Sequence, residues 1–340
     1  MVIVASLLLS TCSGMSPGAP EEPAPSGPTD VVSGDSSAAR RPKRTTTTTT
    51  TTTTAPDLPP TTSPTTTTSP VPEPAPVIGP WRATYTPHGW VATAKSSTYI
   101  AERVRELRAA GFTDQLHNIG VFDAMGDMPA AEYAGLGAWI DTSRRQAPEQ
   151  RVIAWVNGRE ADHVDRAATH QRIAAWVRHA VRDLGVDGVL FDFEPFTRDN
   201  PRLLALLDAV RAQVPEAWLA IASPAERWSE PFIGEVARRV DLLSPMVYDS
   251  TLTSPAAYSD LVRRTALAYH RGAAGRATVA PSLPAYAANK WHDPSVENIA
   301  TAGDGLRVAA AVGAPSGGAA VYWWWQMGPS DLESWTALIR

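Results

Sequence analysis

Cysteine is nearly absent from this 340-residue sequence, because Cys12 is the only one. Residues 80–340 can therefore contain neither a disulfide bond nor a thiolate metal site. The apolar run at residues 2–11 is too short to span a bilayer. The formal net charge is −5 and no basic stripe with interleaved aromatic residues is present, which argues against a nucleic acid partner.

Motifs of several enzyme classes are missing as well. No G-x-G-x-x-G turn follows any candidate strand, so a dinucleotide-binding fold has no support. No G-x-S-x-G elbow surrounds a serine, which argues against a serine hydrolase. The seven histidines are scattered without the spacing of a zinc site. We therefore expect neither a metal nor a cofactor.

The N-terminal residues 1–12 have the pattern of an export signal. The apolar run suits a signal-peptide core, and Leu9-Ser10-Thr11-Cys12 resembles a bacterial lipobox, in which the cysteine becomes lipidated. The alternative is an ordinary cleaved signal with an incidental cysteine. We expect an exported protein, either lipid-anchored through Cys12 on the extracytoplasmic face of the membrane or secreted.

Residues 13–79 are dominated by Thr, Pro and Ser and include an unbroken threonine run, Thr45–Thr54. Such a segment has little apolar surface to bury and does not offset its conformational entropy, so we expect a disordered stalk. Proline stiffens it, which would hold the following domain away from an anchoring surface.

Residues 80–340 alternate between β-rich runs and amphipathic helical patterns. The candidate strands are 82–88, 112–122, 151–158, 186–194, 217–224, 241–249, 276–283 and 318–326. Helical patterns such as 99–111 and 171–185 lie between them and end in glycine. Eight β-α units over this length predict a single (β/α)8 TIM barrel. An open, doubly wound sheet is the alternative.

The segment DGVLFDFEP, residues 187–195, places two acids in a run that otherwise looks like a buried strand. Residues i and i+2 of a strand face the same side, with Cα atoms roughly 6.5–7 Å apart, so Leu190, Asp192 and Glu194 share a face. Active sites of TIM barrels lie at the C-terminal ends of the strands. Two carboxyls at this spacing suit a general acid and a charged helper. The alternative is a structural ion pair with an arginine.

Three segments carry a resemblance to a known family. DGVLFDFEP resembles the fourth-strand motif D-G-x-D-x-D-x-E of family 18 glycoside hydrolases, the chitinases and endo-β-N-acetylglucosaminidases. SPMVYD, residues 244–249, resembles their sixth-strand M-x-Y-D. AVYWWWQM, residues 320–327, is similar to their last strand, which carries a Trp under the sugar.

The resemblance implies roles for individual residues. Glu194 matches the general acid, Asp192 the carboxylate that orients and stabilises the substrate's acetamido group, and Tyr248 the hydroxyl that holds the acetamido carbonyl. The resemblance also implies substrate-assisted retaining hydrolysis, in which the acetamido oxygen is the nucleophile. Leu190 departs from the motif, since the family has an aspartate there, and we expect this difference to alter the rate and the pH optimum.

Further candidates for substrate binding follow from the same motifs and strand ends. Asp249 and Met246 belong to the sixth-strand motif, and either Tyr322 or Trp324 would form the floor under the sugar. Asn157 ends the third strand, where it would bind a ligand or satisfy loop backbone.

Three functions remain open from the sequence. The first is an exported, surface-tethered hydrolase of glycans with β-linked N-acetylglucosamine, such as chitin, peptidoglycan or N-glycans. The second is a catalytically silent carbohydrate-binding barrel, which Leu190 favours. The third is a glycosidase of another class that pairs Asp192 or Glu194 with a carboxylate such as Glu226 or Asp249.

Overall fold

Parallel strands close into a barrel in the computed structural model, which describes residues 76–340. The strands are β1 (Ile78–Thr86), β2 (Asp114–Val121), β3 (Arg151–Gly158), β4 (Gly188–Phe193), β5 (Trp218–Pro224), β6 (Leu242–Met246), β7 (Thr278–Val279), β8 (Ser282–Pro284) and β9 (Ser316–Tyr322). Each strand pairs with its neighbours, β9 lies beside β1, and β5 beside β6 completes the ring. The predicted TIM barrel is confirmed.

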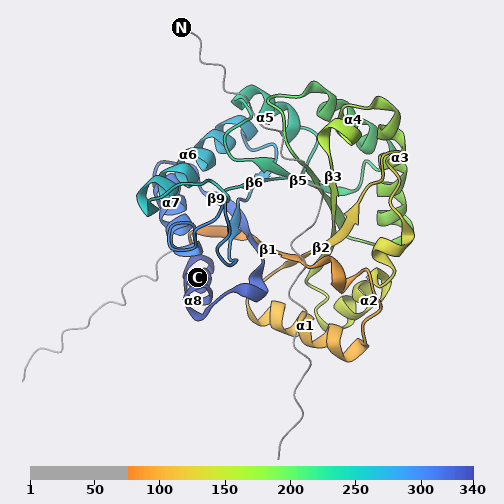
Figure 1. The fold of residues 1–340 in the computed structure, drawn as a ribbon, viewed down its shortest axis with the longest axis horizontal. Helices are drawn as coiled ribbons and strands as arrows, with labels where there is room; N and C mark the ends of the chain where they lie inside the picture. Colours follow the sequence, from red (N-terminus) through yellow and green to blue (C-terminus); the bar gives the residue numbers. More distant parts are fainter. Residues whose placement is uncertain (1–75) are drawn as a thin grey trace, which may run out of the picture. The chain divides into compact units, whose positions relative to one another are not determined.

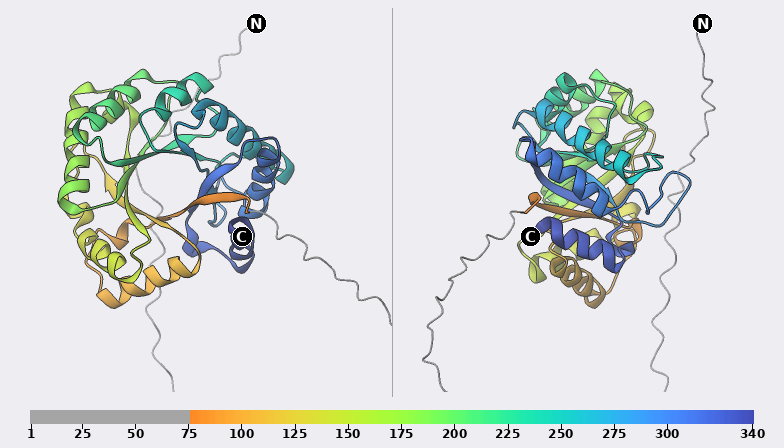
Figure 2. Two further views of the ribbon diagram at one scale, coloured as in Figure 1. Left: turned by 180° about the vertical axis from the view of Figure 1, so that it is seen from behind. Right: turned by 90° about the vertical axis from the view of Figure 1, so that its left-hand side faces the viewer.

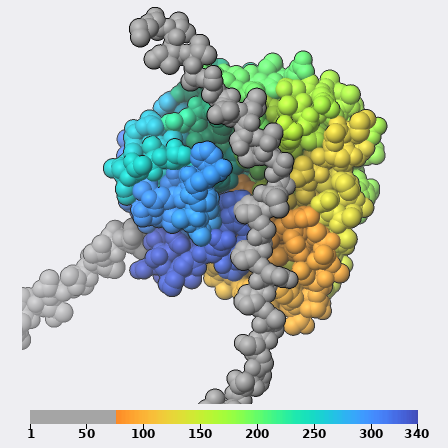
Figure 3. Space-filling model, viewed as in Figure 1, coloured from red at the N-terminus to blue at the C-terminus, as the bar shows by residue number. Residues whose placement is uncertain are grey.

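The helices surround the strands, as Figure 1 shows looking into the barrel and Figure 2 shows from behind and from the side. They are α1 (Ser97–Ala109), α2 (Leu136–Gln146), α3 (Ala167–His179), α4 (Pro201–Gln213), α5 (Glu230–Ala237), α6 (Pro255–Ala273), α7 (Ile299–Ala311) and α8 (Pro329–Ile339). In the space-filling view, segments from α1 in orange to α7 in blue form the rim of this face (Figure 3). None of the helices within residues 76–340 is long and apolar enough to cross a membrane.

Local sequence signals set where these helices begin and end. The side chains of Asn200 and Ser254 cap α4 and α6, and a proline follows each cap at the first helical position. Proline is favoured there because its missing N–H would have no helical partner. Gly185 ends the helical segment after α3 in the left-handed conformation, with φ 83°.

The seventh barrel position is divided between two short strands. β7 and β8 both pair with β6, and β8 also pairs with β9. Pro281 lies between them and has no N–H to donate to the ladder, which interrupts the regular pairing. The predicted single strand 276–283 is therefore one position in the barrel but two pieces of strand.

The first strand begins at Ile78, two residues before the expected start of the domain. Ile78 is buried, and the Val77 N–H donates to the Leu338 carbonyl, so residues assigned to the stalk belong to the barrel. The predicted signal segment, Cys12 and the rest of the Thr/Pro-rich segment lie outside the described residues.

Two apolar cores hold the barrel together. The larger lies between the strands and the helices, and the smaller fills the barrel interior. Aromatic residues from β1 and β3 face small residues from the later strands there, and the set includes Trp81, Tyr85, Trp155, Leu190, Ala220, Ala222 and Ala320. Gly318 leaves room for Trp81, because a Cβ at this position would lie 1.9 Å from the Trp81 carbonyl oxygen.

Trp139 of α2 supplies a test of the outer core. Its side chain is fully buried, its ring stacks on Trp90 at 4.9 Å between centroids, and its indole N–H donates to the Trp90 carbonyl. We expect Trp139→Ala to lower the free energy of unfolding by about 3–5 kcal/mol, measured by urea denaturation. Leu332→Ala, at a position 45% exposed, is the control. Equal losses in the two variants would contradict the packing described here.

Candidate active site

The two acids of DGVLFDFEP lie where β4 opens into the mouth of the barrel. Asp192 is inside the strand and only 7% exposed, whereas Glu194 follows the last strand residue and is exposed. Leu190, on the same face as Asp192, is fully buried among the interior side chains. The alternation of the strand therefore places Leu190, Asp192 and Glu194 at successive levels from the interior to the mouth.

A cavity of about 250 Å³ lies beside Glu194. It is lined by Glu194, Pro195, Phe196, Pro224, Arg227, Met246, Tyr248 and Asp249. A second cavity, of about 420 Å³, shares Pro224, Arg227, Met246, Tyr248 and Asp249 with it and extends to Leu261 and Arg264. Because the two share these walls, they form one groove along the ends of β4, β5 and β6.

Asp192 has one satisfied and one free oxygen. Its Oδ2 accepts a hydrogen bond from the Trp155 indole N–H at 3.1 Å. Its Oδ1 is buried and has no donor partner among the described residues. A buried acceptor without a donor is costly, so this oxygen is suited to receive an N–H or O–H from a ligand or a proton shared with Glu194.

The two carboxyls influence each other's protonation. Burial raises the pKa of Asp192 well above its ordinary value, and the charge of Glu194 raises it further. Enclosure of the Glu194 carboxyl by the groove raises its pKa, as does the charge of Asp249, while the neighbouring Asp192 carboxyl and the charge of Arg227 oppose the rise. The pair therefore retains a proton more readily than ordinary carboxyls.

Aromatic rings form the walls around this pair. Tyr248 stacks on Tyr322 with centroids 5.1 Å apart, and Tyr85 packs edge-on against Trp155 at 4.8 Å and against Tyr322 at 5.5 Å. Burial raises the pKa of Tyr248 well above its ordinary value, so its hydroxyl stays protonated and can donate. These rings surround the two carboxyls with mainly apolar side chains.

The predicted eighth strand contains two candidates for the floor of the site, Tyr322 and Trp324, and only one of these two faces it in the structure. Tyr322 is the last residue of β9 and packs with the interior side chains. Trp323 has a left-handed backbone, with φ 70°, which ends the alternation. Trp324 consequently lies in a 3₁₀ turn and packs against Phe112 in the outer core. Only Tyr322 faces the site.

The other predicted residues are placed as follows. Met246 and Asp249 line the groove. Asn157 pairs in register with Asp192, but its side-chain N–H groups donate to Asn118 Oδ1 at 3.0 Å and the Gly120 carbonyl at 3.3 Å. Asn157 therefore ties β3 to β2 at the level of the site.

Three residues of the site were not among the predicted ones. Trp155 bonds Asp192, Arg227 lines the groove with its charge near Glu194, and Tyr286 donates to Asp249 Oδ1 at 2.8 Å. Tyr286 and Arg227 follow β8 and β5 by two and three residues, so the rule that barrel sites lie at C-terminal strand ends would have selected them. Within residues 76–340, no group of three or more His, Cys, Asp or Glu side chains is arranged to hold a metal ion.

Comparison with known proteins finds relatives of this barrel by fold and none by sequence. No family model and no curated protein matches the sequence. The fold, however, is similar to solved chitinase structures: one from Bacteroides thetaiotaomicron (TM-score 0.58, 12% identity, 77% of this chain and 96% of that chain), a family GH18 chitinase from Cycas revoluta (0.53, 14%, 76% and 98%) and a putative chitinase A from Streptomyces coelicolor (0.52, 18%, 76% and 96%). The predicted resemblance to family 18 glycoside hydrolases is confirmed at the level of the fold.

Proposed function

We propose that this protein is a glycoside hydrolase that cleaves glycans containing β-linked N-acetylglucosamine. The observation that carries the proposal is the pairing of Glu194, an acid with a raised pKa at the edge of a groove, with Asp192, whose buried Oδ1 lacks a donor. An amide N–H of a 2-acetamido group supplies the donor that Asp192 lacks. Glu194, which lies beside Asp192, supplies a transferable proton.

These groups suit substrate-assisted hydrolysis. Glu194 donates its proton to the glycosidic oxygen as the bond to the anomeric carbon breaks, and the acetamido carbonyl oxygen attacks that carbon. Asp192 accepts the amide N–H and stabilises the positive charge that develops on the ring so formed. The Tyr248 hydroxyl donates a hydrogen bond to the carbonyl oxygen. Water then opens the ring, with Glu194 taking its proton, and the configuration is retained.

Turnover of a chromogenic chitooligosaccharide tests the proposal. We expect hydrolysis of this substrate and none of the matched glucose oligosaccharide, which lacks the 2-acetamido group. Allosamidin, the ligand of the similar Cycas revoluta chitinase structure, should inhibit. Comparable rates on both oligosaccharides would point instead to a two-carboxylate glycosidase, and binding without turnover to a silent carbohydrate-binding barrel. A panel of chitin, peptidoglycan and glycoprotein would then identify the natural glycan.

We also propose that the enzyme is exported and tethered through Cys12, on the sequence evidence of the lipobox-like segment and the stalk. If Cys12 is lipidated, the protein expressed with its leader partitions into the detergent phase, and Cys12→Ala releases it into the aqueous phase. Ser13→Ala, a neighbouring change that leaves the cysteine in place, is the control. A multiply acylated cysteine holds a protein firmly, whereas a single chain binds only marginally. Aqueous recovery of the unaltered protein would exclude the anchor and leave export open.

A further inference from the structure

The turn after β6 has an unusual backbone. Asp249 and Thr251 both have left-handed conformations, with φ of 53° and 58°, which residues other than glycine rarely adopt. Such conformations persist only where surrounding contacts hold them, and they gather at functional sites. The turn begins directly after Tyr248, so its conformation decides where the Asp249 carboxylate lies in the groove.

The loop after β8, residues 285–298, holds this turn at two points. The Tyr286 hydroxyl donates to Asp249 Oδ1 at 2.8 Å. Glu297 Oε1 accepts from the Ser250 backbone N–H at 2.9 Å and from the Ser250 hydroxyl. Both partners come from one loop, so these three hydrogen bonds act together on consecutive residues of the turn.

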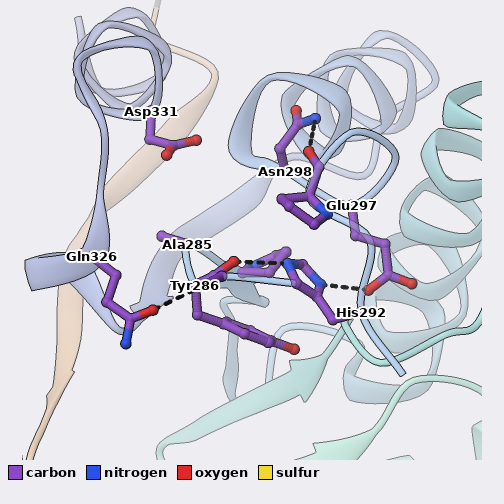
Figure 4. Close-up of a pocket in the computed structure, with 10 residues that line it drawn as sticks. Ala285, Tyr286, His292, Glu297, Asn298, Gln326 and Asp331 are labelled. Carbon is purple, nitrogen blue, oxygen red and sulfur yellow. Dashed lines mark hydrogen bonds and ion pairs between the residues drawn. The ribbon is translucent and has the colours of Figure 1, made fainter. Parts of the chain in front are cut away.

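His292 joins the two attachment points. Its Nδ1 lies 3.1 Å from Glu297 Oε2, and its Nε2 donates to the Tyr286 carbonyl at 3.1 Å. The imidazole also stacks on the Tyr286 ring, with centroids 4.0 Å apart, as the close-up in Figure 4 shows. The His292 and Glu297 side chains are 1% and 0% exposed. Burying such a pair costs desolvation free energy, which its hydrogen bonds offset only when the side chains hold a well-defined arrangement.

We propose that Tyr286, held by the buried His292–Glu297 pair, is a positioning residue that keeps Asp249 beside Glu194. The proposal rests on the proposed hydrolase function. Asp249 and Glu194 line the same cavity, and the charge of Asp249 favours the protonated form of Glu194. The other charged groups around Glu194 are Asp192 of β4 and Arg227 of the loop after β5. Asp249 itself is influenced by Tyr286, His292 and Glu297, all from the loop after β8.

Tyr286→Phe tests this role, because it keeps the ring on His292 and removes only the hydroxyl. Without that hydrogen bond the Asp249 side chain is released and its pKa rises, so less negative charge faces Glu194. We therefore expect the pKa of Glu194 to fall, and the basic limb of the kcat/KM profile on a chitooligosaccharide to move to lower pH. The kcat should fall roughly tenfold, with KM little changed.

Carboxyl ¹³C NMR titration of Glu194 gives a readout that does not need turnover. Tyr258→Phe is the matched control, because this buried hydroxyl donates to the Val247 carbonyl, next to Tyr248, and not to Asp249. The control should lose stability with the Glu194 titration unchanged. In Asp249→Asn, Glu194 should titrate at lower pH, and adding Tyr286→Phe should shift it no further.

An unchanged Glu194 titration in folded Tyr286→Phe would overturn the positioning role. If Tyr286→Phe fails to fold, an unchanged titration in Asp249→Asn would overturn it equally, because Asp249 would then have no influence to position. A wild-type protein without turnover whose Glu194 titration responds as expected would refute the proposed function and leave the positioning inference standing.

Discussion

Glu194→Gln should lower kcat on a chitooligosaccharide by about 10²- to 10⁴-fold while glycan binding survives. Glutamine preserves the shape of the side chain and its hydrogen bonding but has no proton to transfer to the leaving oxygen. Because the loss falls on the transition state and not on ground-state binding, KM should change little. Initial rates under saturating substrate and calorimetric binding of the same oligosaccharide measure the two effects separately.

Glu235→Gln provides the control for this variant. Glu235 lies on α5, does not line the groove, and is paired with Arg238 and Arg239. The same chemical change there should leave kcat within experimental error. A kcat for Glu194→Gln equal to that of Glu235→Gln would remove Glu194 from its catalytic role.

Asp192→Asn is expected to reduce kcat on the order of 10²-fold and at the same time to make the protein more stable at neutral and high pH. The amide oxygen still accepts from Trp155, but the charge opposite the developing cation is lost. The pKa of Asp192 in the folded protein is raised above its unfolded value. The wild type is therefore most stable where Asp192 is protonated and loses stability as pH rises through the folded pKa, whereas the asparagine variant does not titrate there.

Urea unfolding of both proteins across pH measures this difference. The stability gap in favour of Asp192→Asn should widen as pH rises and should close at acidic pH, where the wild-type carboxyl is neutral. A constant difference in the free energy of unfolding over the whole pH range would show that the pKa of Asp192 is not raised in the folded protein. The same protonation also affects activity, because the acid step needs one proton on the Asp192–Glu194 pair. Since the pair has raised pKa values, we expect it to keep this proton, and the enzyme to stay active, at higher pH.

Leu190 bears on the pH dependence expected for Asp192 and Glu194, because it replaces a carboxyl of the family motif. Where the family motif has an aspartate, this chain has a fully buried leucine among the interior side chains. No third carboxyl lies below Asp192 on β4 to repel its charge or take its proton. Glu194 is the carboxyl whose charge raises the pKa of Asp192, so the expected pH behaviour is that of a pair of carboxyls.

The sequence by itself determined the order of the strands and the identity of the two acids. Period-two and period-3.6 patterns are local, so the β-α units could be read from residues that are neighbours in the chain. The spacing of Asp192 and Glu194 is likewise a local property of one strand. The strand ends were less well determined: Glu194 and residues 247–249 lie beyond the last strand residues, Phe193 and Met246.

Only the tertiary structure decided what surrounds the acids. The Trp155 bond to Asp192 joins residues 37 positions apart, and the Tyr286 bond to Asp249 joins residues equally distant in the chain. The choice of Tyr322 over Trp324 depended on the left-handed backbone of Trp323, which the alternating pattern of a strand does not predict. Contacts between distant segments and backbone reversals arise when the barrel closes, because closure alone brings the ends of different strands to one mouth.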